Sequence, residues 1–133
     1  MPEMRVVRPN ERDRSTAQTP GMDRAEGVGA CTVGASSIWA GHVTVGPGVK
    51  SGAHHHGEVE SAIYIISGKA RFRYGERLEH NIEAGAGDFI YVPAYIVHQE
   101  INASSQEPVE MIVTRGSQEN IVVNVEIPEA REA

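Results

Sequence analysis

Histidines and carboxylates gather in one internal stretch of the chain, residues 48–68 (GVKSGAHHHGEVESAIYIISG). It contains His54, His55 and His56 in succession, and Glu60 follows shortly after them. Imidazole and carboxylate donors together suit divalent ions of the first transition series and zinc. In an extended segment His54 and His56 point to one side and His55 to the other, because side chains alternate along a strand. Two imidazoles on one side can bind a single ion.

A third histidine, His98, comes after a second segment bounded by turn residues, GDFIYVP at residues 87–93. Pro93 ends this segment at a point where no backbone donor is needed for strand pairing. We expect His98 early in the following strand. From there its imidazole can reach the ion bound by His54 and His56.

These two segments resemble the motifs of the cupin family. The first motif has Gly, His, His, Glu and Gly, and the residues at those positions here are Gly48, His54, His56, Glu60 and Gly68. The second has Gly, Pro, Gly, His and Asn, and the matching residues are Gly87, Pro93, His98 and Asn102. The resemblance implies a double-stranded β-helix, a jelly-roll-like barrel, with a metal ion in its wider end. It also implies a ligand set of His54, His56, Glu60 and His98.

The chain departs from the two motifs at two places. Tyr95 occupies the position of the glycine in the second motif. The spacing between Glu60 and Gly68 is one residue too long, so counting back from Gly68 puts Ser61 at the ligand position. In a regular strand Ser61 shares a face with Ile63 while Glu60 lies on the opposite face. A β-bulge would turn Glu60 back toward the ion.

The fourth ligand position therefore stays open between several candidates. Glu60 fills it if the strand is bulged, and Ser61 stands there if the strand is regular. His42 from an adjacent strand, or a water molecule, could also occupy it. The ion is Zn²⁺, Mn²⁺, Fe²⁺, Ni²⁺ or Co²⁺, since imidazole and carboxylate suit all five.

Short β-type runs separated by turn residues make up most of the chain. Their spacing of about eight to twelve residues is typical of a sandwich or barrel. The expected runs cover 30–33, 37–45, 61–67, 69–74, 80–83, 88–92, 96–101, 109–114 and 121–125. No window shows a sustained helical period. The pattern predicts an all-β barrel domain over 28–127, a polar N-terminal arm over 1–27 and a C-terminal tail over 128–133.

Several of the expected strands are apolar on both faces, as in AIYII, FIYV and IVVNV. Such a strand needs cover from the core on one side and from something else on the other. We expect a second copy of the chain to supply that cover, and hence a homodimer. Val6 and Val7 of the arm could add a short strand to a neighbouring sheet.

Length and charge limit the classes of function. A chain of 133 residues is long enough for one domain with one core. A net charge of −6 without a run of like charges argues against nucleic acid or an anionic membrane as partner. Neither a secretory signal nor an apolar segment of membrane-spanning length is present, which predicts a cytoplasmic protein. A small-molecule substrate is the expected partner.

Three imidazoles and at most one carboxylate leave coordination positions open for water or substrate oxygens. An ion with open positions acts as a Lewis acid, and iron or manganese can also bind dioxygen. Small cupins of this kind are similar to metal-dependent dioxygenases, isomerases and cyclases of aromatic polyketides. We predict a metal-dependent enzyme acting on a small carbonyl or phenolic, polyketide-like compound. The alternative is a non-catalytic module that binds a small ligand and contains a metal.

Overall fold

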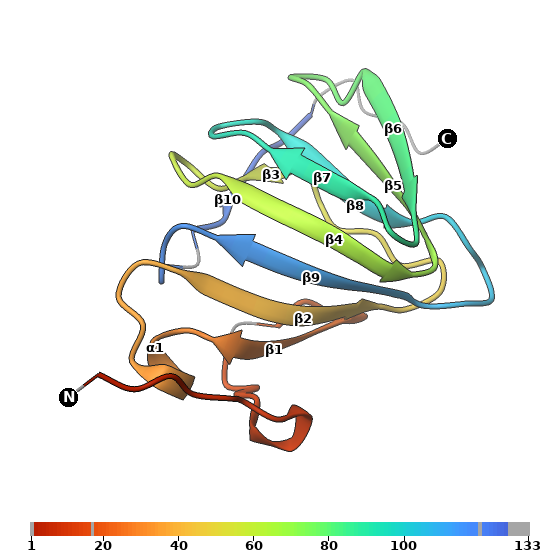
Figure 1. The fold of residues 1–133 in the computed structure, drawn as a ribbon. Helices are drawn as coiled ribbons and strands as arrows, with labels where there is room; N and C mark the ends of the chain where they lie inside the picture. Colours follow the sequence, from red (N-terminus) through yellow and green to blue (C-terminus); the bar gives the residue numbers. More distant parts are fainter. Residues whose placement is uncertain (1, 17, 120, 128–133) are drawn as a thin grey trace.

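Two antiparallel sheets of five strands each form the molecule in the computed structural model, which describes residues 2–16, 18–119 and 121–127 (Figure 1). The first sheet has the order β1-β2-β9-β4-β7 and the second β10-β3-β8-β5-β6. The strands are β1 Met22–Val28, β2 Trp39–Val45, β3 His54–His55, β4 Ser61–Ser67, β5 Lys69–Tyr74, β6 His80–Gly85, β7 Phe89–Val92, β8 His98–Asn102, β9 Val109–Arg115 and β10 Val123–Asn124. The prediction of an all-β fold is confirmed.

Helical structure in the described residues is limited to two short elements. They are a 3-10 turn at Pro9–Glu11 and the helix α1, Ala30–Val33. The prediction of a β run at 30–33 is therefore wrong. Gly34 ends this single turn of helix in the left-handed conformation, with φ of 71°. Neither element is long enough to cross a membrane.

The core lies between the two sheets and is built from the inward residue of each alternating pair. In β2 every second residue is buried, from Trp39 to Val45, and in β4 the buried residues are Ile63 and Ile65. The buried cluster is completed by apolar side chains of both sheets: Met22, Val43, Ala70, Phe72, Ile90, Val92, Val109 and Met111. Period-two alternation thus produces the two-layer fold.

A glycine makes the passage from one sheet to the other possible. Gly68 joins β4 to β5 with φ of 93°, a conformation that other residues rarely adopt. A Cβ atom at this position would lie 2.5 Å from the carbonyl oxygen of Pro108. The tight crossover therefore requires glycine, which explains the last position of the first motif.

More of the N-terminal segment is part of the folded domain than the sequence indicates. Residues 22–28 form β1 and pair with β2, and Met22 and Ala25 are 3% and 1% exposed. The interpretation of 1–27 as an arm outside the core is wrong for this last part. No strand forms over the described residues 2–8, where Val6 is 69% exposed. The predicted tail, 128–133, lies outside the described residues.

The asparagine of the second motif ties the end of β8 to neighbouring turns. The buried Asn102 amide nitrogen donates to the carbonyl oxygens of Val45, Gly46 and Glu107 at 3.1, 3.0 and 2.8 Å. Its amide oxygen accepts a hydrogen bond from the Ser104 backbone at 2.8 Å. One side chain thus ties together the end of β8 and two turns.

We expect Asn102→Ala to lower the free energy of unfolding by about 2–4 kcal/mol, because several buried backbone groups lose their partner at once. Urea denaturation measures the change. Metal content should stay unchanged, because Asn102 lies at the opposite end of β8 from His98. Loss of metal without loss of stability would contradict this structural role.

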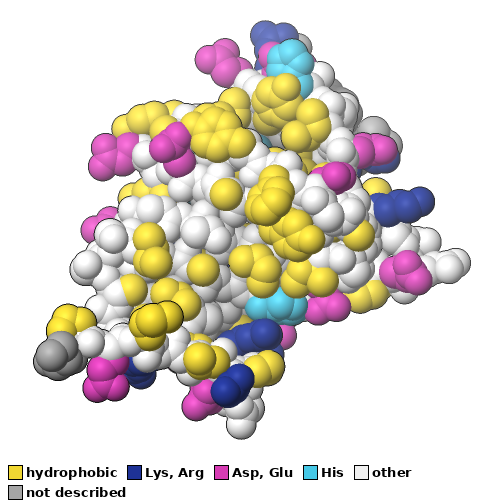
Figure 2. Space-filling view, viewed as in Figure 1, with side chains coloured by type: hydrophobic (Ala, Val, Ile, Leu, Met, Phe, Trp, Pro, Cys, Tyr) yellow, Lys and Arg dark blue, Asp and Glu magenta, His cyan; other side chains and the backbone are white. Residues whose placement is uncertain are grey.

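Apolar side chains are exposed on the outer face of the first sheet. Figure 2 shows hydrophobic side chains gathered over the middle of this face. At outward positions of β4 and β7, Ile66 is 43%, Phe89 77% and Tyr91 64% exposed, and the rings of Tyr64 and Phe89 lie 4.8 Å apart. We propose that a second copy of the chain covers this face, because a contiguous exposed apolar patch favours association.

The homodimer is tested by light scattering at micromolar concentration. The wild type should have the mass of a dimer, and Phe89→Lys combined with Ile66→Lys should have that of a monomer, because charges would be buried in the contact. Ile38→Lys is the matched control, since Ile38 is 52% exposed but precedes β2. A monomeric wild-type protein would end the proposal.

Candidate metal centre

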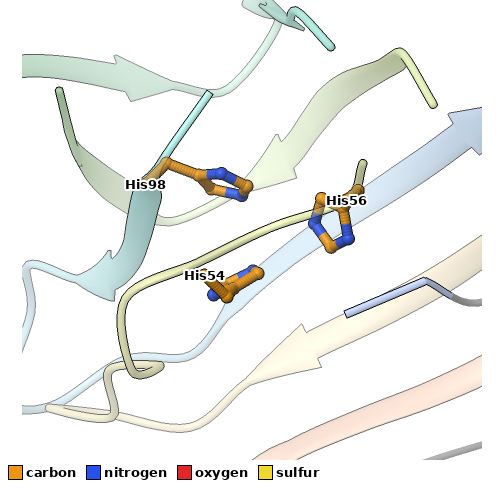
Figure 3. Close-up of side chains that lie close together, drawn as sticks. All are labelled: His54, His56 and His98. Atoms are coloured by element: carbon orange, nitrogen blue, oxygen red, sulfur yellow. The ribbon is translucent and has the colours of Figure 1, made fainter. Parts of the chain in front are cut away.

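Three histidines from two segments converge inside the barrel. His54 of β3 pairs directly with His98 of β8, and His56 follows two residues after His54 on the same side. The ring centroids of His54 lie 4.9 Å from His56 and 4.4 Å from His98, and those of His56 and His98 lie 5.1 Å apart. Figure 3 shows the three rings turned toward one another. Cross-strand pairing and alternation therefore assemble the predicted triad.

Each imidazole is held by a hydrogen bond between its Nδ1 atom and a backbone carbonyl oxygen. The acceptors are Gly52 for His54 at 2.8 Å, Ile121 for His56 at 2.7 Å and Ile96 for His98 at 3.1 Å. A carbonyl oxygen only accepts, so Nδ1 must carry the hydrogen of the neutral ring. Each Nε2 atom then keeps a free lone pair. This is the arrangement in which proteins orient histidine ligands to metals.

Burial keeps the imidazoles of His56 and His98 neutral. It lowers the pKa of His56 to about 4 from 6.5, with smaller contributions from His54 and His98. Burial likewise lowers the pKa of His98, and the nearby Glu100 opposes that shift. Neutral imidazole is the form that binds metal, so protons compete little at neutral pH.

The three residues fit a divalent transition metal. Their ligand atoms all lie within 4.8 Å of one another, and two of the residues are buried. Three imidazoles with free Nε2 lone pairs are the donor type preferred by zinc, copper, iron and nickel. Among the described residues, the sequence-predicted His54, His56 and His98 therefore form a candidate metal centre.

Glu60, the predicted fourth ligand, is not brought to this centre. Its side chain is exposed and accepts a hydrogen bond from the hydroxyl of Tyr91 on the outer face of the sheet. Ser61 lines the cavity instead, together with Ile63. The strand is regular here, because Ser61 pairs with Val92 and Ile63 with Ile90 without a bulge. The alternation argument therefore holds, and the assignment of Glu60 needs correction.

His42, another candidate for the fourth position, also lies elsewhere. Its Nε2 atom is 3.1 Å from a carboxylate oxygen of Glu110 on the outer face. That face is opposite to the one formed by the inward residues Gly41 and Val43 of the same strand. His42 therefore does not contribute to the triad.

Glu100 is a carboxylate at the centre that the sequence reasoning missed. It is 8% exposed, and its Oε2 atom lies 3.8 Å from the Nε2 atoms of both His54 and His98. The signal that could have identified it is strand alternation. In a strand that begins at His98, Glu100 must share the inward face.

The triad opens into a cavity of about 140 Å³ between the two sheets. Its apolar walls include Met22, Trp39, Val43, Ile63, Val92 and Val113, and its polar residues include Ser51, Ser61, Thr19, Arg24, Arg115 and Asn124. Arg115 lies 4.1 Å above the ring of Trp39. Burial lowers the pKa of Arg115, and Arg24 lowers it further. Two cationic groups thus line the cavity that contains the histidines.

The depressed pKa of His56 predicts how the stability of the metal-free protein depends on pH. The unfolded state takes up a proton near pH 6.5 and the folded state only near pH 4. The contribution to stability is therefore complete above pH 6.5 and is lost as the pH falls toward 4. Urea denaturation of the wild type and of His56→Gln across this range measures it. We expect the free energy of unfolding to depend less steeply on pH in the variant than in the wild type. Equal pH dependences would contradict the assignment of the low pKa to His56.

Solved structures share this fold. The polyketide cyclase RemF from Streptomyces resistomycificus has a TM-score of 0.77 and 21% identity over 96% of this chain and 89% of that chain. A single-residue variant of the oxalate decarboxylase OxdC from Bacillus subtilis has a TM-score of 0.69 and 25% identity over 82% of this chain. The match covers 29% of the decarboxylase, so the present chain spans less than a third of that enzyme.

A family model shows which family the sequence belongs to. A search of curated proteins found no match. The model described as "Cupin domain" matches residues 41–115, which is more than half of the chain. The matched segment contains all three histidines of the triad together with Glu100. With its two facing antiparallel sheets and this internal triad, the chain belongs to the cupin family.

Proposed function

We propose that this protein is a metal-dependent enzyme acting on a small carbonyl or phenolic compound. The observation that carries the proposal is the convergence of three imidazoles whose Nδ1 atoms are bound to backbone carbonyls. Their Nε2 atoms face a cavity with both apolar and cationic walls. A bound divalent ion would supply Lewis-acid chemistry or a site for dioxygen.

The cavity walls favour an aromatic or enolisable ligand. Trp39, Val92 and Val113 offer apolar surface to the carbon frame of such a ligand and exclude water from it. Arg24 and Arg115 add positive charge to the same cavity. Positive charge stabilises an enolate or phenolate oxygen more than the neutral compound. The residues of this chain therefore bind and orient the substrate and hold negative charge as it develops.

The solved structures support this class of activity. One of them is described as a polyketide cyclase, whose substrates fall in the proposed class by name. Another is described as containing Mn(II) centres in an oxalate decarboxylase. Both descriptions concern those proteins. For the present chain they make a metal and an oxygen-rich small molecule reasonable starting points for assay.

A second candidate function is a binding module in which the ion is structural. One observation favours it: β3 is only two residues long and pairs with β8 at the single position His54–His98. An ion bound by these two histidines would fasten the strands together. In that case removing the ion would lower stability, and no substrate would be converted.

Substitution of the histidines tests the metal centre. We expect His54→Ala, His56→Ala and His98→Ala each to reduce bound metal to well below one equivalent, because each removes one of three imidazole ligands. Elemental analysis of protein purified without added metal measures it. His80→Ala is the control, since His80 is exposed and stacks on Tyr74. Wild-type protein without bound metal would contradict the proposal.

Turnover tests the enzymatic part. We expect the protein to convert at least one member of a panel of β-diketones and catechols. Chromatography measures the loss of each compound, and oxygen consumption is recorded in parallel. Consumption of oxygen would identify a dioxygenase, and conversion without it a cyclase or isomerase. A metal-loaded protein that converts no member of the panel, but loses thermal stability when the metal is removed, would favour the structural module.

A further inference from the structure

We propose that Glu100 supplies the fourth protein ligand of the metal centre, as a carboxylate from β8 in place of Glu60. This inference rests on the proposed metal centre. It changes the origin of the carboxylate, from the first motif to the strand that carries the histidine of the second. The ligand set becomes three imidazoles and one carboxylate, His54, His56, His98 and Glu100.

The surroundings of the Glu100 carboxylate favour a positive charge. Glu100 is 8% exposed, and a buried carboxylate is costly unless it is paired or hydrogen-bonded. No hydrogen bond to its side-chain oxygens forms among the described residues, and the Nε2 atoms of His54 and His98 each lie 3.8 Å from Oε2. Those atoms are acceptors, because the ring hydrogens are on Nδ1. Lone pairs from imidazoles and carboxylate therefore face one another, and a cation resolves that conflict.

The distances from Glu100 to two of the three imidazoles agree with a shared ion. Oε2 of Glu100 lies 3.8 Å from Nε2 of His54 and 3.8 Å from Nε2 of His98. Two donors that each bind one ion at about 2.0–2.1 Å can lie no more than about 4.2 Å apart. Both distances fall within that limit. The carboxylate is also equally close to both imidazoles, as expected for a donor adjacent to each of them.

The backbone position of Glu100 is fixed by Ser51. The Ser51 hydroxyl accepts a hydrogen bond from the Glu100 backbone N–H at 3.0 Å, and the Ser51 N–H donates to the Glu100 carbonyl at 2.9 Å. The neighbouring Gln99 amide nitrogen donates to the carbonyl of Ser51 at 2.8 Å. Because three bonds hold this part of β8, the carboxylate is presented to the histidines by a rigid strand. Rigid presentation of this kind is typical of ligating residues.

Glu60 has the opposite environment. It is exposed and hydrogen-bonded to Tyr91, and the inward position beside it belongs to Ser61. A serine offers no carboxylate to the ion. In this centre a carboxylate from β8 would take the place of the carboxylate of the first motif. The donor types, three imidazoles and one carboxylate, would stay the same.

Metal affinity of matched variants tests the proposal. We expect Glu100→Gln to weaken binding of Zn²⁺ and of Mn²⁺ at least about tenfold, measured by competition with a chromophoric chelator. Glu60→Gln is the matched control, the same substitution at the carboxylate of the first motif, and should bind as the wild type does. Equal affinity of Glu100→Gln and the wild type would overturn the proposal, and so would weaker binding by Glu60→Gln alone.

Thermal unfolding gives a second measurement. Metal-free Glu100→Gln should unfold at the same temperature as the metal-free wild type or higher, because the amide removes a buried charge and can donate to the imidazole lone pairs. The rise in unfolding temperature on adding saturating Zn²⁺ should be smaller in the variant. A lower unfolding temperature of the metal-free variant with an undiminished rise would show a structural role instead.

A second variant, in which an imidazole replaces the Glu100 carboxylate, keeps the proposal testable if Glu100→Gln disturbs folding. Glu100→His should retain Co²⁺ binding, and the visible absorption of the bound Co²⁺ should change because a nitrogen replaces an oxygen donor. An unchanged Co²⁺ spectrum would overturn the proposal. The histidine variants separate this outcome from failure of the proposed function: if His54→Ala also leaves metal binding intact, the metal centre itself is wrong.

Discussion

The hydrogen bonds from imidazole Nδ1 atoms to backbone carbonyls are the interactions on which the whole site depends. They place the ring hydrogens on the outside of the triad and leave three Nε2 lone pairs on the inside. The carbonyls of Gly52, Ile96 and Ile121 come from three separate segments. The barrel must therefore be folded before the histidines can act as ligands. Burial completes the arrangement by keeping the rings of His56 and His98 uncharged.

The two ends of the barrel differ in the inward residues that β8 contributes to them. Asn102 occupies one end and donates to three carbonyls, so that end is closed by hydrogen bonds between strand and turns. His98 occupies the other end, where the partners are histidines and the cavity begins. Glu100 lies between them on the same face. A single strand therefore carries a structural residue, a buried carboxylate and a histidine of the candidate metal centre at successive inward positions.

Much of this could be predicted from the sequence because it depends on local rules. Glycines, the spacing of apolar runs and alternation along a strand predicted the all-β fold and the convergence of His54, His56 and His98. The same alternation placed Ser61 inward, and the structure agrees. Counting forward from His56 instead favoured Glu60, and it failed because the strand is regular from Ser61 to Ile63, which puts Ser61 on the inward face. Glu100 was missed because the motif names only His98 and Asn102 in that strand.

Other parts depended on long-range contacts that no local pattern reveals. Residues 22–28 read as a polar arm, yet they form an edge strand because β2 offers a partner for them and the core accepts Met22 and Ala25. Glu26, near the end of that strand, is buried because Trp39 Nε1 and the Thr32 backbone both donate to it. From the sequence alone such a carboxylate is expected at the surface. Its partners are only found once the chain has folded.

The charges that surround the triad distinguish this site more than the fold does, since the barrel itself serves many activities. Glu100 places a negative charge beside the imidazoles, and Arg24 and Arg115 place positive charge in the same cavity. A divalent ion next to Glu100 would lose part of its charge to that carboxylate and polarise a ligand less strongly. The arginines then gain importance, because they can stabilise the negative oxygen that the ion holds less tightly. With a neutral fourth ligand the ion would keep more of its charge and stabilise the negative oxygen more strongly. The identity of the fourth ligand therefore determines how much of that stabilisation comes from the ion and how much from the arginines.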